Sequence, residues 1–79
     1  DITKKTFDLL SYFIQNSNRI ITKEQIITRF WGDTDIFPEN TLTVHIHKLR
    51  SIIEENPSKP EYLITKRGQG YQFNIALQN

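Results

Sequence analysis

Short polar and cationic side chains recur along one side of a predicted helix over residues 39–55. Side chains of this kind can hydrogen-bond the edges of base pairs in a DNA major groove, and the methyl groups of a valine can contact a thymine methyl. A solvated polar face with one stray valine is the competing interpretation of this helix taken alone. The residues opposite its apolar stripe are Asn40, Val44, His47, Lys48 and Ser51.

A second cationic feature is the turn at residues 66–70 (KRGQG), where Lys66 and Arg67 precede two glycines. Glycines at this spacing are typical of a hairpin turn. An arginine at such a tip can enter a narrow minor groove, where the negative potential is enhanced. The alternative is an ordinary exposed turn. A polar helix followed closely by a basic hairpin favours double-stranded DNA as the ligand more strongly than either feature alone.

Three helices are predicted from apolar periodicity and capping residues. The first covers residues 4–15 with Thr3 as its N-cap, the second follows a capping box at residues 22–25 and ends near Trp31, and the third covers residues 39–55. The residues that follow the helical period at the first helix are Ile2, Thr6, Leu9, Leu10, Phe13 and Ile14. The predicted core residues are Ile26, Ile27 and Phe30 in the second helix and Leu42, Ile46, Leu49 and Ile53 in the third.

Three short strands complete the predicted fold. The β-branched pair Ile20-Ile21 predicts one, and residues 61–65 and 71–75 predict the two strands of a hairpin. Because an isolated hairpin is marginal in water, we expect all three strands to form one sheet. This order predicts an α+β fold: a winged helix-turn-helix with three helices, a short strand and a C-terminal β-hairpin wing.

Composition limits the class of protein. The chain has 79 residues, a formal net charge of +1 and no cysteine, so we expect one domain without disulfides or thiolate metal sites. No apolar run approaches the roughly 20 residues that a membrane-spanning helix requires. The sequence contains no Met, and we therefore expect residues 1–79 to be a domain from a longer protein.

An enzyme is the main rival interpretation. His45 and His47 are two residues apart on a helix, point in different directions and cannot share a metal, so we expect His45 to be packed or hydrogen-bonded. The glycines of the hairpin turn lack the following helix and spacing of a dinucleotide-binding loop. No nucleophile–base set or pair of carboxylates stands out. We therefore predict no catalytic residue, cofactor or metal site.

The motifs in this chain resemble a known family. Residues 40–50 (NTLTVHIHKLR), residues 64–71 (ITKRGQGY) and Phe30-Trp31-Gly32 together resemble the effector domain of OmpR/PhoB-type response regulators. The resemblance spans essentially the whole chain. It implies a bacterial cytoplasmic protein that controls transcription by binding promoter DNA, often as two copies on direct repeats. It also implies RNA polymerase as a partner, and a cognate histidine kinase acting through a receiver domain that these residues lack.

The resemblance also assigns roles by position. It implies that Arg67 enters the minor groove and that the loop 32–38 faces RNA polymerase. The implied base contacts are Val44, His47 and Lys48; the DNA backbone contacts are Lys23, Trp31, Asn40, Thr41, Arg50, Ser51, Thr65 and Tyr71; the polymerase-facing residues are Asp33, Asp35, Ile36 and Phe37. The chain departs from the family pattern at three positions. The family usually has Arg where Asn40 stands and Asp where Thr43 stands, and it often has a basic residue where His47 stands.

Two further expectations follow. The family's effector domain opens with a small antiparallel sheet that precedes the first helix and is missing from these residues, so we expect the part of that helix that would cover the sheet to be unusually exposed. The alternative function is a winged-helix module that binds protein without reading DNA, for which Ile36 and Phe37 could supply an apolar contact.

Overall fold

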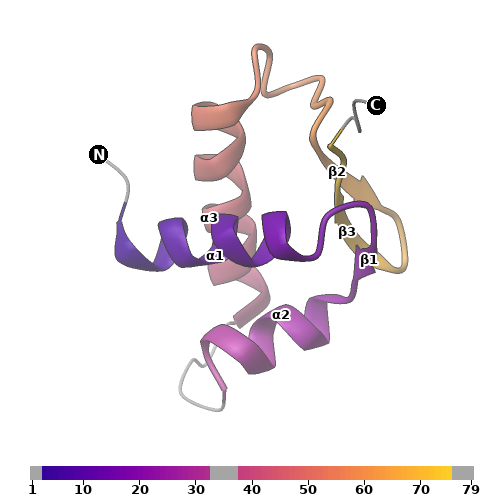
Figure 1. The fold of residues 1–79 in the computed structure, drawn as a ribbon. Helices are drawn as coiled ribbons and strands as arrows, with labels where there is room; N and C mark the ends of the chain where they lie inside the picture. The colour runs from indigo at the N-terminus through magenta and orange to yellow at the C-terminus, as the bar shows by residue number, and fades with distance from the viewer. Residues whose placement is uncertain (1–2, 33–37, 76–79) are drawn as a thin grey trace.

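The computed structural model describes residues 3–32 and 38–75 and shows a winged helix-turn-helix, as predicted (Figure 1). In Figure 1 α1 crosses α3, α2 lies below both, and the small sheet stands at one side. The elements are α1 (Lys4–Gln15), β1 (Ile20–Ile21), α2 (Lys23–Phe30), α3 (Pro38–Ile53), β2 (Leu63–Lys66) and β3 (Gly70–Phe73).

The helix starts follow the predicted capping chemistry. Thr3 accepts a hydrogen bond from the backbone N–H of Thr6, and Thr22 and Gln25 form the full capping box. α3 begins at Pro38, slightly earlier than predicted, because proline is well suited to the first helical turn. It ends at Ile53 rather than residue 55, ahead of Pro57, whose ring disfavours helical backbone at the preceding residue.

The sheet is antiparallel in the order β1-β3-β2, so β3 pairs with both other strands. Ile21 lies opposite Tyr71, and Tyr71 lies opposite Thr65. Gly70 has a φ of 148°, and a Cβ atom there would overlap the Ile21 carbonyl oxygen, so the close approach of β3 to β1 requires glycine.

Both hairpin strands are shorter than predicted, because other groups take their terminal hydrogen bonds. The backbone N–H groups of Glu61 and Tyr62 bond the Glu54 carboxylate. At the far end of β3, the N–H of Ile75 bonds the side chain of Asn18, a residue with a φ of 64°. Side chains therefore continue the pairing where the ladder stops.

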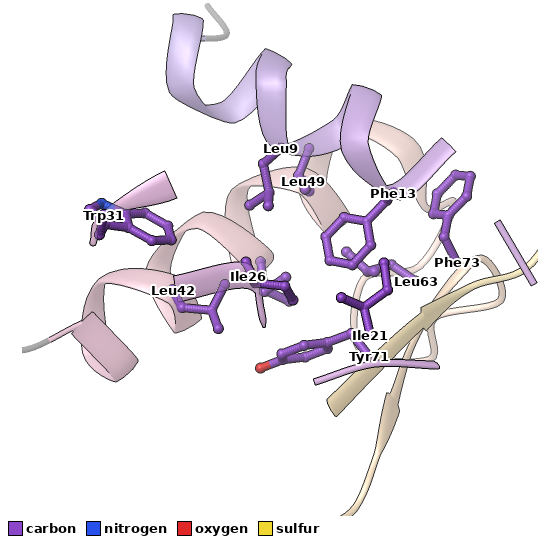
Figure 2. Close-up of a cluster of buried hydrophobic side chains, with 11 residues drawn as sticks. Leu9, Phe13, Ile21, Ile26, Trp31, Leu42, Leu49, Leu63, Tyr71 and Phe73 are labelled. Carbon is purple, nitrogen blue, oxygen red and sulfur yellow. The ribbon is translucent and has the colours of Figure 1, made fainter. Parts of the chain in front are cut away.

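One apolar cluster joins all three helices to the sheet (Figure 2). Phe13 of α1 meets Tyr71 of β3 edge to face, with ring centroids 6.5 Å apart. Three predicted core residues, Ile27, Phe30 and Ile53, are only partly buried. The cluster consists of Leu9, Phe13, Ile21, Ile26, Trp31, Leu42, Ile46, Leu49, Leu63, Tyr71 and Phe73.

The predicted exposure of α1 is confirmed at Phe7 and Ile14, which are 56% and 47% exposed. Ile14 follows the helical period but is not buried, because the described residues cover only the side of α1 that carries Leu9 and Phe13. These two side chains leave apolar surface in solvent on the far side of α1.

Candidate nucleic-acid interface

The predicted outer face of α3 is exposed. Val44 retains 52% of its accessible surface. The Ser51 hydroxyl donates to the backbone carbonyl of His47 at 3.0 Å and so stays close to the helix. Residues 40–53 contain no acid. The face is therefore polar and cationic, with exposed side chains at Asn40, Thr43, Val44, His47, Lys48 and Ser51.

The tip of the β2–β3 hairpin, called the wing below, is also exposed. The backbone N–H of Gln69 donates to the Lys66 carbonyl at 2.8 Å and closes the turn. Gly68 adopts a φ of 77°, which a side chain would disfavour. Arg67 is exposed at this tip. Its guanidinium makes no ion pair or hydrogen bond within the part of the chain that the structure describes.

Arg50 connects α3 to the wing. Its Nε and Nη2 atoms both donate to the Leu63 carbonyl, at 3.0 and 2.9 Å, and Nη2 also donates to Thr65 Oγ1 at 2.8 Å. Arg50 lies roughly 60° around the helix from His47, given about 100° per residue. The wing is therefore attached to the side of α3 that lies next to the outer face of this helix.

Glu54 holds the same strand and was missed by the sequence reasoning. Its side chain is only 7% exposed. The carboxylate accepts hydrogen bonds from the backbone N–H groups of Glu61, Tyr62 and Leu63, the shortest at 2.8 Å. A lone acid at the end of a helix is usually solvated, so nothing local distinguished Glu54 from its exposed neighbour Glu55.

The opposite flank of α3 packs on α1 and α2 through His45. Its Nδ1 lies 3.0 Å from the Thr6 hydroxyl, and its ring lies 5.4 Å from that of Trp31. Thr3 donates its hydroxyl hydrogen to Thr6, which leaves the Thr6 hydrogen for Nδ1. Burial, and then the charges of Lys48 and Lys5, lower the pKa of His45. The expectation of a packed, hydrogen-bonded His45 is confirmed.

The implied DNA backbone contacts have different surroundings. Trp31 and Tyr71 are core residues with only 9% and 6% of their surface exposed, so at most an edge of each can reach a phosphate. Arg50 and Thr65 bond each other. Of the remaining positions, Lys23, Asn40 and Ser51 are exposed and Thr41 is partly buried.

The implied polymerase-facing residues Asp33, Asp35, Ile36 and Phe37 lie outside the described residues. Within residues 3–32 and 38–75, no three His, Asp or Glu side chains gather in a way that could hold a metal ion. The helices of the same part of the chain are too short or too polar to cross a membrane.

Comparison with known proteins agrees with this geometry. The family described as "Transcriptional regulatory protein, C terminal" matches residues 1–73. The chain belongs to this family. Sensory transduction protein RegX3 of Mycolicibacterium smegmatis is 48% identical over 69 residues, which are 87% of this chain and 30% of that protein. Transcriptional regulatory protein YvrH of Bacillus subtilis is 48% identical over 65 residues, or 82% of this chain and 27% of that protein.

A solved structure is similar over nearly the whole chain. The response regulator DrrB, an OmpR/PhoB homolog from Thermotoga maritima, matches with a TM-score of 0.85 and 29% identity over 95% of this chain and 34% of that chain. The resemblance to OmpR/PhoB-type effector domains is thereby confirmed, and the assignment to DNA-binding transcriptional regulation rather than catalysis follows from the family. The chain spans about 30% of the length of the curated relatives it matches.

Proposed function

We propose that this domain binds promoter DNA sequence-specifically, with α3 in the major groove and the wing at the adjacent minor groove. The observation that carries the proposal is the acid-free, exposed outer face of α3 beside an exposed arginine turn. Lys48 and His47 can donate to base edges, and Val44 can contact a thymine methyl. Arg67 extends into the minor groove, where a narrow A·T-rich segment attracts a guanidinium.

Contacts with phosphates position the domain in this arrangement. Lys23, Asn40 and Thr41 supply charge, amide and hydroxyl donors, and the exposed edges of Trp31 and Tyr71 can add one contact each. Ser51 can donate to a phosphate only after it releases the His47 carbonyl.

The domain acts within a longer response regulator in this proposal. The relatives named as sensory transduction and transcriptional regulatory proteins are about three times as long as this chain, which leaves room for a receiver domain phosphorylated by a cognate histidine kinase. A second copy on a direct repeat and RNA polymerase at the loop 32–38 complete the assembly, in the bacterial cytoplasm.

A titration tests the proposal. Duplexes selected from a random pool are labelled, and binding of the 79-residue chain is followed by fluorescence anisotropy at several salt concentrations. If roughly six phosphates are neutralised, affinity falls about a thousandfold between about 50 and 200 mM salt. Weak affinity for every duplex at low salt contradicts the proposal and favours a module that binds protein.

Lys48→Ala tests the reading face, and Lys59→Ala is its matched control. Both changes remove one exposed lysine charge, but Lys59 lies in the loop after α3. We expect Lys48→Ala to cost about 1–3 kcal/mol of binding free energy and to relax preference at one base pair. Lys59→Ala should leave base preference intact. Equal effects of the two variants would place the reading face elsewhere.

A further inference from the structure

The start of β2 is held by α3 from two directions. The backbone N–H of Leu63 donates to Glu54 at 2.8 Å, and the backbone carbonyl of Leu63 accepts from Arg50 at 2.9 Å. Arg50 and Glu54 are four residues apart, so they project from the same side of α3. The Leu63 side chain is fully buried. Leu63 is therefore fixed by its backbone N–H, its backbone carbonyl and its buried side chain.

We propose that Arg50 is a positioning residue which, together with Glu54, fixes the wing relative to α3 and so sets the distance between the major-groove and minor-groove contacts. The proposal rests on the proposed DNA-binding function. It gives Arg50 a different role from the phosphate contact that the family resemblance implies.

The hydrogen bonds of Arg50 favour this role. Its Nε–H and both Nη2–H groups are directed to Leu63 and Thr65, which uses three of the five guanidinium donors. A phosphate at this edge of the guanidinium would have to displace the Leu63 carbonyl. The planar fork of arginine matches this pair of acceptors, and a lysine ammonium cannot reproduce it.

The hairpin pairing and the turn hold Arg67 in a fixed position relative to Thr65. Thr65 lies opposite Tyr71 and Lys66 lies opposite Gly70, so both are held by the sheet up to the turn. The turn itself is closed by the 2.8 Å bond from Gln69 to Lys66. On α3, Arg50 is two residues from Lys48. The Arg50 guanidinium is thus the polar link between the proposed base-contacting lysine and the proposed minor-groove arginine.

A double-mutant cycle tests the link. Arg67→Ala should weaken binding to an A·T-flanked operator about tenfold, the size of one charge-assisted contact. Arg50→Lys keeps the positive charge but loses the fork, and we expect a similar loss because Arg67 is then free to sample other directions. The double variant should bind no more than about twofold more weakly than Arg67→Ala alone. Additive losses, or wild-type binding by Arg50→Lys, would overturn the proposal.

Two controls separate positioning from instability. Circular dichroism melts establish that each variant is folded at the titration temperature. Thr65→Val removes one acceptor of Arg50 at nearly constant side-chain shape, and it should cause a smaller loss that also disappears in the Arg67→Ala background. Lys23→Ala, a proposed phosphate contact on α2, should add to Arg67→Ala in full.

Side-chain NMR provides a readout without a substitution. The Nε–H resonance of Arg50 should exchange slowly in the DNA-free chain and shift little when operator is added. A resonance that becomes protected only with DNA identifies a phosphate contact and overturns the proposal. If the wild-type chain binds no duplex, the proposed function fails as well. If it binds but the losses add, only the positioning role fails.

Discussion

The two flanks of α3 are held by different kinds of contact. On the wing flank, charged side chains at Arg50 and Glu54 bond backbone groups of the strand. On the other flank, the neutral ring of His45 lies between the Thr6 hydroxyl and the Trp31 ring.

The comparison shows that different residues of α3 hold the neighbouring elements in place and face the proposed ligand. Both flanks use polar groups that are satisfied within the protein, and the strip between them carries the side chains that can bind a ligand. Because the two flanks differ in charge, burial and partner, each can be weakened separately. The wing flank should have the larger effect on stability, since its hydrogen bonds join charged side chains to backbone groups and hold a buried backbone donor.

The largest expected effect is that of Glu54→Ala. The variant leaves backbone N–H groups near Leu63 without their acceptor, and we expect the free energy of unfolding to fall by about 3 kcal/mol. Urea unfolding measures it. Glu55→Ala is the control, because Glu55 is the exposed neighbour and its loss should cost less than about 0.5 kcal/mol. Similar values for the two variants would show that the carboxylate does not hold the strand.

Thr6→Val tests the other flank. Thr6 is 1% exposed, and the change removes its hydroxyl, which bonds both Thr3 and His45, while keeping the branched shape. We expect a loss of about 1 kcal/mol in the free energy of unfolding, typical of a neutral hydrogen bond. Thr43→Val removes an exposed hydroxyl that bonds the Glu39 carbonyl, and serves as the matched control. A loss as large as that of Glu54→Ala would remove the proposed contrast between the flanks.

The smallest expected effect is the dependence of stability on pH through His45. Its pKa is below the ordinary 6.5 because of burial and, secondarily, the charges of Lys48 and Lys5. The unfolded chain therefore takes up this proton first, and the contribution of His45 to stability is present above pH 6.5 and is lost as pH falls towards its folded pKa.

Urea midpoints at about pH 7.5 and pH 5.5 can isolate this contribution. We expect the wild type to lose more stability on acidification than His45→Gln. If His45→Gln and the wild type respond equally to acid, His45 does not couple this flank to pH.

The predictions from sequence succeeded where neighbours in the chain decide the structure. Thr3 and the Thr22–Gln25 box cap their helices, and the α3 residues Leu42, Ile46 and Leu49 are buried as their spacing indicates. The predictions failed at the ends of the hairpin strands. There Asn18, which is 57 residues from Ile75, and Glu54, which is seven to nine residues from its partners, take the hydrogen bonds that the ladder would otherwise make.

The candidate site divides in the same way. Exposure of Val44, His47 and Lys48 follows from the period of α3 and was predicted. The roles of these side chains on DNA remain predictions. Arg50 was assigned to the DNA backbone by family resemblance alone, because a sequence shows that an arginine is present but not which acceptor lies within its reach.

The sequence by itself determined the three helices, their caps, the hairpin and the polar face of α3, because each depends on periodicity or on contacts between residues within about one helical turn. Only the tertiary structure decided that Arg50 and Glu54 bond the backbone carbonyl and N–H of Leu63, that His45 bonds Thr6, and that Trp31 and Tyr71 are core residues. The Arg50 and His45 contacts join residues 13 and 39 positions apart, and Glu54 bonds Leu63 nine positions further along the chain. Their hydrogen-bond partners are set by how the elements pack, which no local pattern encodes.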